Sequence, residues 1–117
     1  MQKQPKIITW NILRAGHEML AAILTFIESL YGGVIILLLQ ECQNLGEDSP
    51  LPSWELFHVC GGFTALAVSS SLAPSIRGAP THEERASGIL LGDLAVISSY
   101  LPDSWKPLIE YEREIEK

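Results

Sequence analysis

The spacing of hydrophobic residues changes along the first third of the chain. A short run of β-branched and aromatic residues, Lys6–Asn11, predicts a strand. From His17 to Leu30 the apolar residues recur at intervals of three and four, which predicts a helix that the Gly32-Gly33 pair would end. Val34–Leu39 is continuously aliphatic, as in a strand buried on both faces. Because a helix is the usual connection between neighbouring parallel strands, these elements predict a strand, helix, strand unit with parallel strands.

The middle of the chain predicts shorter strands between polar loops. Asn44–Ser53 contains Asn, Gly, Asp, Ser and two prolines, which is typical of a loop. Trp54–Val59 and Phe63–Ser69 have strand composition on either side of Gly61-Gly62 and predict a hairpin. Ser70–Ser87 is polar and contains two prolines and a glycine, so we expect a surface connection there.

The last third of the chain predicts a second hairpin and a final helix. Gly88–Leu91 and Leu94–Ser99 read as strands that flank a Gly92-Asp93 turn. Pro102–Pro107 is rich in turn-forming residues, and the apolar residues that follow lie among charges at roughly helical spacing. The whole pattern predicts an α/β fold in one domain that spans residues 1–117.

An alternative interpretation places part of this unit in a membrane. Met19–Leu39 contains a single charged residue and is long enough to cross a bilayer. Glu28 and Ser29 lie near the middle of that stretch, and the pattern changes from helical to continuously aliphatic after Gly32-Gly33. We therefore favour no transmembrane segment, and a small membrane protein anchored by residues 19–39 stays as an alternative.

Composition adds limits on partners and on compartment. The chain has 117 residues, 47% of them hydrophobic, which is enough for the core of one small domain. Its net charge of −6 argues against sequence-independent binding of nucleic acid, which depends on Lys and Arg side chains that neutralise phosphates. Cys42 and Cys60 have no CxxC spacing, and no secretory leader precedes them, so we expect two reduced, buried thiols in an intracellular protein. The sequence does not distinguish a cytoplasmic from a nuclear location.

Polar residues follow the two strands that we expect to be parallel neighbours. Asn11 ends the first of these strands, and Gln40-Glu41 follows the second. The carboxyl ends of parallel strands meet at one edge of a sheet, where ligands of α/β proteins usually bind. A carboxylate there suits Mg²⁺, which prefers oxygen ligands and often takes only one or two from protein. The alternative is that Asn11 is a turn residue and Glu41 a solvated strand end.

Three segments in order along the chain resemble the endonuclease/exonuclease/phosphatase superfamily. They are Trp-Asn-Ile at 10–12, Leu-Leu-Leu-Gln-Glu at 37–41 and Ser-Ser-Tyr-Leu-Pro-Asp-Ser at 98–104. The last is most similar to the endonuclease domains of non-LTR retrotransposons. The resemblance implies a two-sheet α/β sandwich like that of deoxyribonuclease I and a hydrolase that cleaves phosphodiester bonds. It also implies that Asn11 and Tyr100 contact the reacting phosphate and that Glu41 binds Mg²⁺ or Mn²⁺.

Other segments of that superfamily do not occur in this sequence. A Gly-Asp-x-Asn segment normally follows the tyrosine strand, and an Asp-His pair closes the domain; the chain has neither. The resemblance therefore covers an N-terminal half, and we expect a truncated domain that is inactive alone and self-associates through uncovered sheet faces. One hypothesis is a fragment of a nuclease that acts on DNA, and the other is a non-enzymatic remnant that serves as an interaction module.

Overall fold

A computed structural model of the chain describes residues 5–58, 61–83, 86–92 and 94–99. These residues form one α-helix, one 3₁₀ helix and seven strands in two sheets. In chain order they are β1 (Lys6–Asn11), α1 (His17–Tyr31), β2 (Ile35–Gln40), β3 (Trp54–Phe57), β4 (Thr64–Ser69), η1 (Ser70–Ser75), β5 (Ile76–Glu83), β6 (Ala86–Leu91) and β7 (Leu94–Ser99).

The first sheet contains the predicted strand, helix, strand unit. Its strand order is β1-β2-β4-β3, and β1 lies parallel to β2 with α1 as the connection, as the sequence predicts. The helix ends at Tyr31, and the φ of +61° at the following Gly32 is a backbone conformation that costs glycine little. The amide of Gly32 donates to the carbonyl of Glu28 and so closes the last turn. The predicted hairpin of β3 and β4 is confirmed, since the two strands pair antiparallel.

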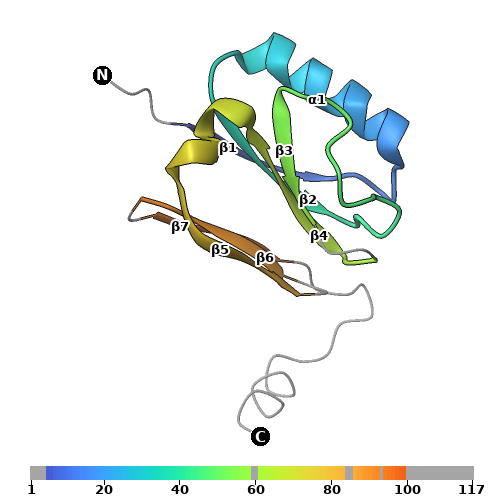
Figure 1. Cartoon of the computed structure of the whole chain (residues 1–117). Coiled ribbons are helices and arrows are strands. Elements are labelled where there is room, and N and C mark those ends of the chain that lie inside the picture. The colour runs from blue at the N-terminus through green and yellow to red at the C-terminus, as the bar shows by residue number, and fades with distance from the viewer. Residues whose placement is uncertain (1–4, 59–60, 84–85, 93, 100–117) are drawn as a thin grey trace, which may run out of the picture.

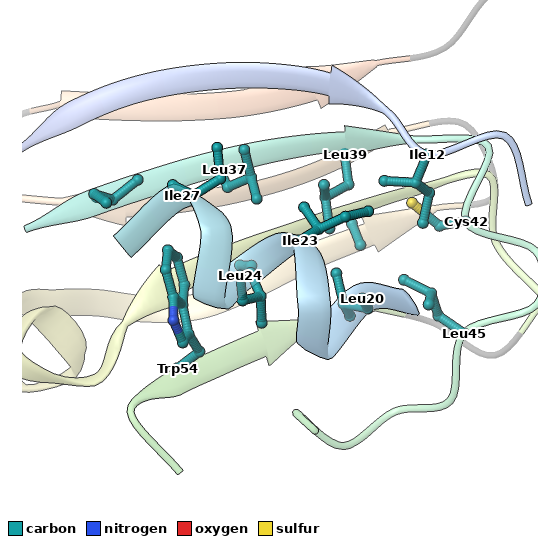
Figure 2. Packing of buried hydrophobic residues seen from close by; sticks show 13 residues of the cluster. Ile12, Leu20, Ile23, Leu24, Ile27, Leu37, Leu39, Cys42, Leu45 and Trp54 are labelled. Atoms are coloured by element: carbon teal, nitrogen blue, oxygen red, sulfur yellow. The ribbon is translucent and has the colours of Figure 1, made fainter. Parts of the chain in front are cut away.

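Helix α1 covers one face of this sheet and makes the larger core with it. Leu20, Leu24 and Ile27 recur on one side of the helix and are buried against the aliphatic side chains of β2 (Figure 2). Trp54 of β3 closes the far end of this core, and its indole N–H donates to the carboxylate of Glu28. Glu28 also accepts a hydrogen bond from Ser53, 3.0 Å away. The single charge in the apolar stretch 19–39 therefore ties the helix to the start of β3.

The second sheet lies against the opposite face of the first (Figure 1). It is an antiparallel meander of β5, β6 and β7. Ile89 and Val96 of this sheet pack on Ile36, Leu66 and Val68 of β2 and β4. The chain thus forms three layers, a helix, a four-stranded sheet and a three-stranded sheet, which explains why β2 and β4 are mostly apolar and are buried along nearly their whole length.

One sequence prediction is corrected by the structure. The surface connection predicted for Ser70–Ser87 is wrong, because η1 and β5 occupy most of it and β6 begins at Ala86. Strand β5 pairs with β6 through backbone groups, and the register shifts between Arg77 and Thr81, where Gly78 and Pro80 lie. Because β5 is an edge strand, proline there removes no hydrogen bond that the sheet needs. Composition alone therefore did not predict this strand.

The membrane alternative has no helix to support it. Residues 19–39 divide between α1 and β2, and no helix in the described part of the chain is long and apolar enough to cross a bilayer. The loop predicted at Pro102–Pro107 and the helix predicted after it lie outside the described residues.

Candidate functional site

The structure brings Asn11 and Glu41 to the same edge of the first sheet. Asn11 lies opposite Gln40 in the parallel register of β1 and β2, and Glu41 directly follows Gln40. The backbone segments that follow β1 and β2 stay paired beyond the strands, since the amide of Ile12 donates to the carbonyl of Gln40 at 3.1 Å. The amide of Arg14 then donates to the carbonyl of Glu41 at 3.0 Å. We call Asn11–Arg14 together with Glu41 the carboxyl edge.

The carboxyl edge has an unusual backbone. Leu13, Arg14 and Glu41 have φ values of +53°, +63° and +56°, and no other non-glycine residue in the described ranges has a positive φ. The left-handed conformation costs an L-residue about 1–2 kcal/mol. Strain of this kind persists only where surrounding structure holds it, and it clusters at functional sites. Three such residues on two adjacent strand ends therefore mark this edge as a candidate site.

Two carboxamides hold the strained loop in place. The side-chain oxygen of Asn11 accepts a hydrogen bond from the amide of Leu13 at 2.9 Å. The side-chain nitrogen of Asn44 donates to the carbonyl of Arg14 at 2.7 Å. Asn11 therefore acts as a turn residue, which is the alternative that the sequence left open. Its NH₂ group is a hydrogen-bond donor at the same edge. Asn44 and Arg14 are residues of this edge that the sequence did not single out.

The carboxyl edge offers few ligands for a cation. Glu41 is half-buried, and the described residues contain no group of three His, Cys, Asp or Glu side chains that could enclose a metal ion. One carboxylate fits a cation that keeps most of its water, as Mg²⁺ does, and the NH₂ group of Asn11 is a hydrogen-bond donor that does not bind the cation itself. A single carboxylate does not fit a closed structural site of the zinc type.

Cys42 is next to Glu41 but does not have the chemistry of a nucleophile. Its side chain is fully buried beside Ile12 and Leu45, beneath the ends of β1 and β2 (Figure 2). Burial and the negative charge of Glu41 raise the pKa of the thiol from its ordinary 9.0 to about 12. The thiolate that nucleophilic chemistry requires is therefore absent at neutral pH. The expectation of a reduced, buried thiol is confirmed for Cys42, and Cys60 lies outside the described residues.

The histidines near this edge also have structural partners. The ring nitrogens of His58 lie 3.0 and 2.9 Å from the carbonyl oxygens of Gly46 and Gly62, and the ring is buried. His58 thereby ties the loop that follows Glu41 to the turn between β3 and β4. His17, at the start of α1, packs against Gly46 of the same loop, with its Cε1 atom 3.4 Å from where a Cβ would stand. Both rings stabilise the loop that supports the carboxyl edge.

Tyr100 lies outside the described residues, directly after Ser99 at the end of β7. Comparison of the chain with protein-family models, curated proteins and solved structures finds no match. The function therefore has to be inferred from the sequence and from the geometry of this edge.

Proposed function

We propose that the carboxyl edge binds a phosphodiester together with a divalent cation, in the manner of the endonuclease/exonuclease/phosphatase superfamily. The observation that carries this proposal is the pairing of Asn11 with Gln40, which brings Asn11 and Glu41 to one edge of the sheet, where Leu13, Arg14 and Glu41 have strained backbone. The three-layer arrangement supports it, because a helix on one face of two packed sheets is compatible with half of a two-sheet α/β sandwich.

Each residue of the edge has a role that its chemistry suits. Glu41 would hold Mg²⁺ or Mn²⁺, and the cation would stabilise negative charge on the phosphate. Arg14 is an exposed guanidinium on the strained loop, and a guanidinium binds phosphate oxygens through paired hydrogen bonds. Asn11 fixes that loop through its oxygen and presents its NH₂ group. By the resemblance, Tyr100 would contact the phosphate from the side of β7.

We expect binding without turnover from the 117 residues. Hydrolysis also needs groups that orient and activate the attacking water. The superfamily segments that carry them, Gly-Asp-x-Asn and the Asp-His pair, do not occur in this sequence. The net charge of −6 further predicts weak affinity for DNA.

Binding of a short DNA duplex, measured by fluorescence anisotropy, tests this proposal. We expect binding in Mg²⁺ that is lost in EDTA and is weakened at least about tenfold by Glu41→Gln, the loss typical of a charge-assisted contact. The control Glu55→Gln removes an exposed carboxylate from β3, at the far edge of the same sheet, and should leave binding unchanged. Equal affinity with and without Mg²⁺ would count against the proposal. Nicking of plasmid DNA that Glu41→Ala abolishes would show that the chain is an active nuclease.

A further inference from the structure

Polar side chains lie between the two sheets at the end of β2. The side-chain nitrogen of Gln40 donates to the hydroxyl of Thr9 at 3.0 Å and lies 3.4 Å from the hydroxyl of Ser98 on β7. Ser98 in turn donates to the carbonyl of Leu39 at 3.0 Å. Ser98 is only 1% exposed and Gln40 is half-buried, whereas Thr9 is exposed, so these contacts lead from the surface into the interface between the sheets. We call Thr9, Gln40 and Ser98 the polar clamp.

The clamp differs from the rest of the interface between the sheets. Farther along β2 and β4 that interface consists of Ile36, Leu66 and Val68 against Ile89 and Val96. Apolar side chains pack in several relative positions at similar free energy, whereas buried hydrogen-bonding groups are satisfied in few. A buried hydroxyl or carboxamide that loses its partner costs stability. The clamp therefore selects one placement of β7 on β2.

The clamp also joins the strand ends that carry the predicted site. Gln40 directly precedes Glu41 on the first sheet, and Ser98 is the penultimate residue of β7, two residues before Tyr100. Its contacts thus connect the sheet that holds Glu41 with the strand that leads to Tyr100. We propose that Gln40 is a positioning residue, whose carboxamide sets the end of β7 against the carboxyl edge through Ser98. This inference rests on the proposed function.

An apolar contact between the sheets, away from the clamp, provides the control. Thr64 and Ser87, whose hydroxyls lie 2.9 Å apart, are the strand-pairing partners of Gln40 and Ser98, so they belong to the same polar region. Ile36 is fully buried between the sheets and lies on β2 four residues before Gln40, about 13 Å along the strand. If Gln40 acted only through general stability, Ile36→Val would have the same effects as loss of the clamp.

The test combines stability with a spectroscopic measurement on the ¹⁵N-labelled full chain. Gln40→Met keeps the length of the side chain and removes its donors, and Ser98→Ala removes the hydroxyl. We expect the two changes to be coupled in a double-mutant cycle by at least about threefold in the unfolding constant, as for residues in one network. In a cycle of Gln40→Met with Ile36→Val, two residues about 13 Å apart on β2, the effects should be additive. Absence of coupling between Gln40 and Ser98 would overturn the clamp, whether or not the chain binds a cation.

The positioning role is tested by adding Mn²⁺ and measuring the broadening of amide NMR signals. Mn²⁺ is paramagnetic, so it broadens the signals of amides that lie near it. With the wild type we expect broadening at the amides of Ser98 and Ser99. In Gln40→Met and Ser98→Ala this broadening should fall at least about twofold, while the affinity for Mn²⁺ changes less than about twofold because Glu41 is retained. Ser98→Thr, which keeps a hydroxyl, should restore it, and Ile36→Val should leave it unchanged.

Two results would contradict the positioning role. Unchanged broadening in Gln40→Met would show that the clamp does not place β7 relative to Glu41. An equal loss in Ile36→Val would show that the effect is one of general stability. If Mn²⁺ broadens no signal in the wild type, the proposed function fails, and the double-mutant cycle decides separately whether the clamp exists.

Discussion

Replacement of Glu41 by glycine should stabilise the protein, although it removes the proposed cation ligand. Glu41 has a φ of +56°, which costs an L-residue about 1–2 kcal/mol. Glycine adopts this conformation freely but costs about 0.5–1 kcal/mol in backbone entropy. The net expectation for Glu41→Gly is a gain of about 0.5–1 kcal/mol in the free energy of unfolding.

Glu47→Gly is the matched control for this prediction. Glu47 lies exposed in the loop that follows Glu41, and its φ is not positive. The same substitution there should lower the free energy of unfolding by about 0.5–1 kcal/mol. Urea unfolding followed by tryptophan fluorescence should therefore separate the two variants by about 1–2 kcal/mol. Equal destabilisation of both variants would refute strain at the carboxyl edge.

The remaining predictions concern the core and the outer face of the second sheet. Leu37→Ala, at a fully buried position, should cost about 2–5 kcal/mol in urea unfolding, and a cost below about 1 kcal/mol would contradict the observed packing. Trp54→Phe removes the indole donor to Glu28 and should cost about 1–3 kcal/mol, and Glu28→Ala should then cost less in that variant than in the wild type. Burial raises the pKa of Cys42 from 9.0 to about 12, so the free energy of unfolding should fall as the pH rises from 9.0 towards 12. This fall should be smaller in Cys42→Ala, and an equal fall in both proteins would contradict the prediction. Ile97 is 61% exposed on β7, and Ile97→Thr should reduce self-association in sedimentation velocity; a wild type that stays monomeric at high concentration would contradict the expectation of uncovered faces.

The strand, helix, strand unit could be predicted because its signal lies in the spacing of apolar residues. The intervals of three and four in α1 and the aliphatic run of β2 follow directly from what each element buries. Strand β5 could not be predicted in this way, because backbone pairing with β6 holds it and its composition includes Gly78 and Pro80. Pairing between distant strands depends on register, which composition does not encode.

The candidate site could be predicted only in part for a related reason. Asn11 and Glu41 follow strands that were themselves predictable, so their position at one edge was a direct consequence. The strain at Leu13, Arg14 and Glu41 had no signal, since none of them is glycine or asparagine, the residues typical of a positive φ. The role of Gln40 depends on its contact with Ser98 in the other sheet, which required the packing of the sheets to be known.

Mapping of Mn²⁺ on the ¹⁵N-labelled chain tests the central claim most directly. We predict that low concentrations of Mn²⁺ broaden the amides of Asn11, Arg14 and Glu41 before those of α1 and β3. We further predict that Glu41→Gln abolishes this selectivity and that Glu55→Gln does not. Broadening that is spread over the surface, or that survives Glu41→Gln, would contradict a cation site at the carboxyl edge.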